Sequence, residues 1–196
     1  MITKGYDLPQ ITLVGIILAD TALSLPDFRA SERAFQVLTQ VAGRAGRGDK
    51  KGEVIIQTFN PEHYSIASAC SHDYLGFYRQ ELLFRQELNY PPFSRIVTFR
   101  LEGREEEALR SYASHFGTIV REVLEKEGYQ QEVEVLGPAP APLAKLKGRY
   151  RYQMLLKGKK LKPLHALVGR LLKEKALQPT GKRIRWSVDV DPLQMM

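Results

Sequence analysis

Two arginines near residue 45 have the type and spacing needed to contact a phosphate group. Arg44 and Arg47 lie three positions apart in the segment QVAGRAGR, residues 40–47, among glycines and alanines. An arginine is always charged and offers a rigid fork of N–H donors that matches phosphate oxygens. Arginines so placed can stabilise the charge on a transferring phosphoryl group. The alternative is a solvated helix C-terminus, where arginines interact favourably with the helix dipole.

A second candidate group lies in the last third of the chain, which holds 14 basic and 3 acidic residues from position 137 onward. In GRYRYQMLL the strand period of two separates Arg149 and Arg151 from the tyrosines between and beyond them. We predict that the tyrosines are core residues, and that both arginines are exposed with Lys145 and Lys147 as phosphate contacts. A concentrated basic region is typical of a polyanion-binding surface, and a solvated basic face is the alternative.

The composition excludes several other classes of site. Cys70 is the only cysteine, so the chain can form neither an internal disulfide nor a cysteine-based zinc site, and we expect it to be a buried thiol in a reducing, cytoplasmic setting. The apolar run at 11–19 is too short to span a membrane, which needs about 20 residues. No membrane partner is therefore predicted, and this run is expected to be a buried strand.

The elements that must position the first arginines occupy residues 1–60. A continuous apolar strand over 11–18, a helix that Ser31 could cap, and a strand over 53–59 have the pattern of an α/β layer with a parallel sheet. The glycines at 43, 46 and 48 are expected to end the helix. Residues 61–89 are predicted to be helical within a connector that ends at 92, and the prolines of NYPPFS mark a domain boundary.

Residues 93–196 carry the basic group, and their element order is strand, helix, strand, strand, helix, strand. This order is that of an α+β ferredoxin-like (βαββαβ) domain. The proline-rich GPAPAP is expected to be a rigid connector after a short strand at 133–136. The last strand places Arg185, Asp189 and Asp191 on its polar face, where salt bridges to arginines are favoured over a metal site. The other predicted spans are strands 96–101, 150–156 and 184–190 and helices 104–126 and 163–177.

Motifs on these elements resemble those of a known enzyme family. TKGYDLP, residues 3–9, precedes the first strand, and QVAGRAGR follows the next helix, in the order of motifs V and VI of superfamily 2 helicases. YPPFSR, VLGPAPAPLAKLKGRYRYQMLLK and RWSVDVDP extend the resemblance to the replication-restart helicases over nearly the whole chain. The resemblance implies a partial RecA-like helicase lobe in residues 1–60, a helical connector in 61–92, and a DNA-binding domain in 93–196.

The resemblance also implies an activity and partners. The implied activity is that of an ATP-dependent 3′ to 5′ DNA helicase that recognises stalled or branched replication forks and restarts replication by primosome assembly. ATP, magnesium and zinc are the implied cofactors of the whole enzyme. Branched and single-stranded DNA, the single-stranded-DNA-binding protein and primosome proteins are the implied partners, in a nucleoid-associated location. The implied site residues are Arg47 as the finger to the γ-phosphate, Arg44 as a second phosphate contact, Gln40 and Gly43 at the turn, Gly5 and Asp7 at the nucleotide edge, and Thr3 and Lys4 at the DNA backbone.

The sequence lacks motifs that the family uses to bind ATP and metal ions. It contains no G-x-x-x-x-G-K-[ST] phosphate loop, no D-E-x-[HD] acidic box and no zinc-binding cysteines. We therefore expect the chain alone to be inactive as an ATPase, whether it is a fragment of a longer helicase or the product of a truncated reading frame. The alternative function is a non-enzymatic module that binds nucleic acid or a protein partner.

Overall fold

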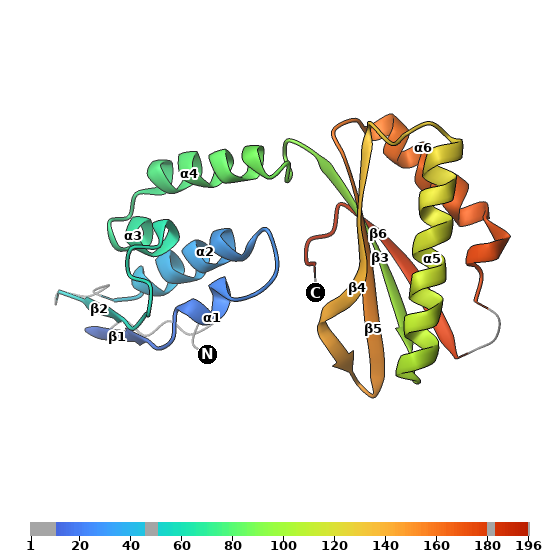
Figure 1. Cartoon of the computed structure of the whole chain (residues 1–196). Helices are drawn as coiled ribbons and strands as arrows, with labels where there is room; N and C mark the ends of the chain where they lie inside the picture. Colours follow the sequence, from blue (N-terminus) through green and yellow to red (C-terminus); the bar gives the residue numbers. More distant parts are fainter. Residues whose placement is uncertain (1–10, 46–50, 180–182, 196) are drawn as a thin grey trace. The chain divides into compact units, whose positions relative to one another are not determined.

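The computed structural model describes residues 11–45, 51–179 and 183–195. The chain divides into two compact units, 1–84 and 85–196 (Figure 1). The first contains a two-stranded parallel sheet and the second a four-stranded antiparallel sheet, so the mixed α/β class is confirmed. The division between the units falls a few residues before the prolines of NYPPFS.

The first unit is built from short elements. They are β1 (Leu13–Ile16), α1 (Asp20–Leu23), α2 (Ala30–Ala42), β2 (Glu53–Ile56), α3 (Tyr64–Cys70) and α4 (Tyr74–Glu87), whose last residues belong to the second unit. The prediction that the first strand is buried on both faces is wrong. Leu13 is 57% exposed and Ile17 77% exposed, because among the described residues β1 pairs with β2 alone.

Small side chains and aromatic rings form the core of this unit. Phe35 of α2 stacks on Phe77 of α4 at 4.2 Å between ring centroids, so Phe77 serves packing, whereas Tyr74 and Tyr78 of the same helix are exposed. The predicted continuous helix is two helices, and the Asp73 carboxylate accepts a hydrogen bond from the Gly76 amide at the start of the second. Cys70 is exposed, so the prediction of a buried thiol is wrong.

The start of α2 also differs from its prediction. Ser31 lies inside the helix, and Asp27 organises the preceding turn instead. Its carboxylate accepts from the Arg29 amide at 3.0 Å and from Arg33 Nη1 at 2.9 Å. A buried, ion-paired aspartate therefore fixes the entry into the helix that leads to the arginine turn.

The second unit has the predicted element order. It consists of β3 (Arg95–Gly103), α5 (Glu106–Lys126), β4 (Val133–Leu146), β5 (Arg149–Gly158), α6 (Leu161–Lys173), the short 3₁₀ helix η1 (Lys175–Leu177) and β6 (Ile184–Val190). The strands are arranged β4-β5-β3-β6, and every neighbouring pair is antiparallel. Helices α5 and α6 cover one face of this sheet (Figure 1).

That covered face holds the larger core of the chain. Phe99 lies between Phe116 of α5 and Trp186 of β6, with ring centroids 5.4 and 5.8 Å away. Helical spacing alone would also place Ala108 of α5 and Leu172 of α6 in the core, but both are exposed. In α5 the first buried residue is Leu109, and Phe116, Ile119 and Val123 follow it in the core.

The prediction that GPAPAP is a connector is wrong, because these residues belong to β4. Proline lacks an N–H group and is tolerated on an edge strand, where one side makes no ladder bonds. β4 is such an edge and pairs only with β5 in the sheet. Its register shifts between Leu136 and Ala139 and again between Pro140 and Lys145, so the prolines bend the strand without ending it.

Candidate functional site

The helix that carries the first candidate group ends where the sequence predicts. α2 stops at Ala42, the Gly43 amide donates to the Thr39 carbonyl at 3.0 Å, and the Arg44 amide donates to the Val41 carbonyl at 3.1 Å. Gln40 is exposed and Arg44 is half-buried. The predicted residues Thr3, Lys4, Gly5, Asp7 and Arg47 lie outside the described residues, so their roles stay predictions.

The basic group in the second unit sits on the β4–β5 hairpin. Lys147 and Gly148 form its two-residue turn, and both have positive φ, 48° and 74°. Positive φ at both central residues is the signature of a type I′ turn, which suits the twist of a tight hairpin. Lys147 is therefore exposed at the tip.

The structure does not place the four predicted basic residues on one face. Lys145 pairs with Tyr150 across the hairpin, with Nζ 3.1 Å from the tyrosine hydroxyl oxygen and 4.5 Å from the ring centroid. Arg149 pairs with Leu146 and so lies on the opposite face. The basic residues near the tip therefore lie on both faces of the hairpin. The alternation of residues along one strand does not reveal this division, because it depends on how the two strands pair.

The prediction that both arginines are exposed is wrong, because Arg149 is half-buried and Arg151 is buried. The Arg151 side chain is only 9% exposed, and its Nε lies 3.6 Å from Glu102 Oε1 on β3. The register shift leaves residues 141–144 of β4 opposite this position. Sequence periodicity gives the face of a strand but not what covers that face, so it could not detect the burial.

The last strand forms ion pairs, as predicted. Asp189 lies 3.6 Å from Arg100 Nη2, and Asp191 lies 2.8 Å from Arg95 Nη1. Across residues 11–45, 51–179 and 183–195, no group of three or more histidine, cysteine or acidic side chains could hold a metal ion. Asp189 of β6 and Asp191 just after the strand are thus partners of arginines.

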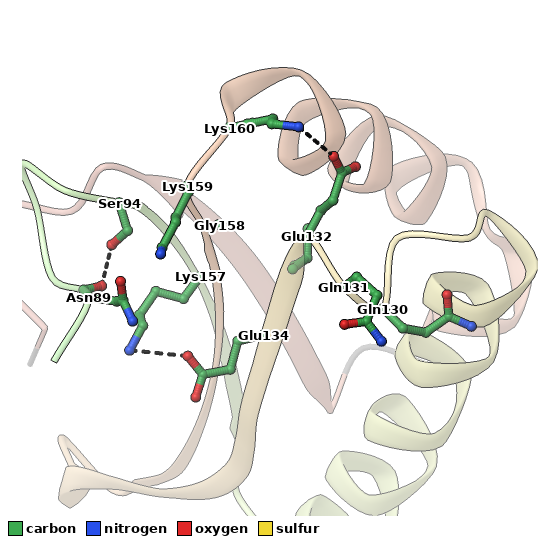
Figure 2. A pocket seen from close by; sticks show the side chains of 11 residues that line it. Asn89, Ser94, Gln130, Gln131, Glu132, Glu134, Lys157, Gly158, Lys159 and Lys160 are labelled. Carbon is green, nitrogen blue, oxygen red and sulfur yellow. Dashed lines mark hydrogen bonds and ion pairs between the residues drawn. The ribbon is translucent and has the colours of Figure 1, made fainter. Parts of the chain in front are cut away.

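A pocket of about 460 Å³ in the second unit was not foreseen from the sequence. Figure 2 shows its lining, which comes from the segment before β3, the α5–β4 loop and the end of β5. Lys157 is 9% exposed there, and its Nζ donates to the Leu88 carbonyl at 3.0 Å and lies 3.2 Å from Glu134 Oε2. Lys160 pairs with Glu132 at 3.1 Å. No short motif could have revealed a pocket assembled from three separate segments.

Two ionisable groups in the described residues have pKa values displaced by burial. The pKa of His63 is lowered below its usual 6.5, chiefly because burial disfavours the charged ring. Burial raises the pKa of Tyr112 to about 12, and its hydroxyl donates to the Leu177 carbonyl at 2.6 Å. Both groups serve structure, since His63 caps α3 and Tyr112 ties α5 to η1.

Within the described ranges, no helix is both long and apolar enough to cross a membrane.

Comparison with known proteins assigns the chain to a family. Residues 86–193 match the family model described as "Primosomal protein N C-terminal domain". Proteins named Replication restart protein PriA match the whole chain, with 40% identity in Bacillus subtilis, 41% in Synechocystis and 40% in Treponema pallidum. The chain covers 24%, 22% and 29% of those three proteins, so it spans about a quarter of their length.

The matched range coincides with the second unit, from the end of α4 to the segment after β6. The predicted resemblance to replication-restart proteins is therefore confirmed. The chain belongs to the family of the primosomal protein N C-terminal domain.

Proposed function

We propose that this chain is the rear part of an ATP-dependent 3′ to 5′ DNA helicase that recognises stalled or branched replication forks and restarts replication by primosome assembly. Family membership and the name of its relatives support this proposal. The first unit would be part of a RecA-like lobe and the second a DNA-binding domain. The single-stranded-DNA-binding protein and primosome proteins would be its protein partners.

The observation that carries the DNA-binding role is the basic tip of the β4–β5 hairpin. Lys147 lies in the two-residue turn, and Lys145 and Arg149 flank the turn on the two strands. Their three charges therefore lie at one end of the hairpin. The strand order β4-β5-β3-β6 with two helices on one face supports the ferredoxin-like assignment. Lys145 and Lys147 are exposed and Arg149 is half-buried, and a phosphate backbone is the ligand that such a group of cations fits best.

The proposed contact with ATP is supported by fewer described residues than the proposed DNA binding. Arg44 follows directly after the capped end of α2, and its guanidinium is a suitable donor set for a phosphate. Arg44 would therefore contact ATP bound with magnesium in the whole enzyme, together with Arg47. In that reaction the nucleotide supplies the phosphoryl group, and the arginines would stabilise its charge.

The DNA-binding role is tested by fluorescence anisotropy with a forked and a single-stranded DNA over a series of salt concentrations. In K145A/K147A/R149A we expect weaker binding and a salt slope reduced by about 0.7 to 0.9 per lost phosphate contact. The matched control R110A/K126A/K173A removes three exposed cations from α5 and α6 and should behave as the wild type. Equal losses in both variants would contradict a role for the hairpin.

The proposal also predicts that the chain alone does not hydrolyse ATP. The sequence contains no phosphate loop, so the β- and γ-phosphates would lack the backbone cradle that P-loop enzymes provide. Phosphate release with saturating single-stranded DNA should equal that of a no-protein blank. DNA-stimulated turnover by residues 1–196 would overturn this prediction.

A further inference from the structure

A group of arginines lies on the sheet face of the second unit that α5 and α6 leave uncovered. The strand pleat directs Phe99 and Leu101 of β3 into the core, so Arg100 and Glu102 point to the opposite face. The register places Arg151 of β5 and Arg185 of β6 on either side of Glu102. Two arginines therefore flank one carboxylate on this face, and Arg100 lies two residues before that carboxylate on the same strand.

Glu102 is shared between two guanidinium groups. Its Oε2 accepts hydrogen bonds from Arg185 Nε at 2.9 Å and Nη2 at 2.6 Å. Its Oε1 lies 3.6 Å from Nε of the buried Arg151. One negative charge facing two fixed positive charges leaves the group with a surplus of positive charge.

The hydrogen-bonding capacity of these arginines is incompletely used. Among the described residues, the buried Nε atoms of Arg100 and Arg151 have no hydrogen-bond acceptor. Arg100 donates through Nη2 to the Gln194 carbonyl at 2.8 Å and lies 3.6 Å from Asp189. Buried donors without an acceptor are costly, and these Nε atoms are themselves inaccessible, so an added anion would instead contact the exposed parts of the Arg100 and Arg185 side chains.

The group is reachable and continuous with the basic hairpin. The side chain of Arg185 is 66% exposed and that of Arg100 is 25% exposed. Arg149 lies two residues before Arg151 on β5 and therefore shares its face. A strand of nucleic acid held at the hairpin tip could continue along β5 onto this face.

We propose that Arg100 and Arg185 form a second contact surface for the phosphodiester backbone of nucleic acid, on the sheet face that α5 and α6 leave uncovered, and that the buried Arg151 adds positive charge beside Glu102. In the free protein Glu102 occupies the Arg185 guanidinium and Asp189 lies beside that of Arg100, and phosphate oxygens compete with these carboxylates on binding. Arginine forks bind phosphate and carboxylate in the same bidentate way. This inference rests on the proposed DNA-binding role of the second unit.

The first test removes the two accessible arginines. R100Q/R185Q is compared with R110Q/K126Q, which removes two cations from α5 on the other side of the sheet. With a labelled single-stranded oligothymidylate, the salt slope of R100Q/R185Q should fall by about 0.7 per lost contact, and that of the control should not. Equal slopes in the two variants overturn the proposed surface, and thermal unfolding shows that each variant is folded.

The second test removes the competing carboxylate. E102Q should bind the oligothymidylate severalfold more tightly than the wild type. E134Q removes the same charge on the same face, beside Lys157, and should have a smaller effect. An E102Q affinity no higher than that of E134Q overturns the competition by Glu102.

These results also separate this inference from the proposed function. If K145A/K147A/R149A weakens binding while R100Q/R185Q matches its control, the hairpin binds DNA and the arginine face does not. If the wild-type chain binds neither forked nor single-stranded DNA, both proposals fail.

Discussion

The two units differ in how completely they bury their apolar residues. The second unit has a continuous core of 18 buried residues between its four-stranded sheet and two helices. The described residues of the first unit form a core of six, and Leu13, Ile17, Ile55 and Phe59 are more than half exposed. Because buried apolar area is the main source of stability, the second unit should be the more stable body.

The same contrast is visible in the sheets. In the described residues of the first unit, two short parallel strands pair over four residues each, and a groove of about 560 Å³ lined by β1, α1 and α2 stays open. In the second unit β3 pairs along nearly its full length with strands on both sides. Sheets of two strands are marginally stable alone. We therefore expect the stabilities of the two units to respond separately to mutation, acid and base.

The largest effect should come from emptying the second core. Phe116 is 1% exposed and contacts both Phe99 and Trp186. Phe116→Ala should lower the free energy of unfolding of this unit by about 3–5 kcal/mol, from lost burial and the cavity left behind. Trp186 is the only tryptophan, so urea unfolding followed by its fluorescence measures this unit.

Hydrogen exchange of β1 and β2 serves as the control for that experiment. Their amides should exchange at the wild-type rate in Phe116→Ala if the two units unfold separately. Faster exchange in the first unit would show that its stability depends on the second core, contrary to the comparison.

The core of the second unit was largely predictable, and the reasons are physical. Alternation in β3 and β6 and helical periodicity in α5 and α6 are fixed by backbone geometry, so element order and most core residues follow from the sequence. Whether other elements cover a given face of a strand or helix depends on tertiary packing, which the local pattern does not contain. For that reason the exposure of Ile17 and the burial of Arg151 both contradicted their predictions.

The candidate sites show the same limit. The end of α2 before Arg44 was predicted from the glycines, and the basic residues of the hairpin from their charge. The division of these residues between two faces depends on the register of β4 after its prolines. The arginine group around Glu102 joins residues more than 80 positions apart, Glu102 and Arg185, which no local pattern connects.

The next largest effect concerns the acid response of the first unit. His63 Nδ1 accepts from the Ser65 amide at the start of α3, at 3.3 Å. His63→Ala should cost about 0.5–2 kcal/mol through loss of this cap, and His63→Asn should restore much of it, because asparagine is a good N-cap residue.

The pH dependence of His63 has a definite sign. Its pKa is lowered in the folded state, so the unfolded chain binds a proton more readily, and stability present above pH 6.5 is lost as pH falls. Hydrogen exchange of α3 at pH 7.5 and 5.5 measures this, and the pH effect should vanish in His63→Ala. A pH effect of equal size in the variant would exclude His63 as its source.

Tyr112 should give a smaller effect in the second unit, at the opposite end of the pH scale. Tyr112→Phe removes one hydrogen bond to the Leu177 carbonyl, which still accepts from Trp186 Nε1 at 2.9 Å. The cost should be about 0.5–1.5 kcal/mol at neutral pH.

Alkaline titration separates Tyr112 from other contributions. Its pKa is raised from 10.0 to about 12 in the folded state, so the stability it contributes is complete below pH 10 and is lost between pH 10 and about 12. Trp186 fluorescence in urea at pH 9 and pH 11 measures the loss. The difference between the two pH values should be smaller in Tyr112→Phe, and an unchanged difference would assign it to another group.

The smallest effect should come from the exposed strand of the first unit. Ile17 follows β1 and is 77% exposed, so Ile17→Ser removes little buried apolar area and should change stability by no more than about 0.5 kcal/mol. Phe35→Ala is the reference, since Phe35 is 6% exposed and stacks on Phe77, and should cost about 3–5 kcal/mol. Hydrogen exchange of α2 measures both variants. Similar losses would mean that Ile17 is covered in solution, and the contrast between the two units would then be smaller than the exposed fractions indicate.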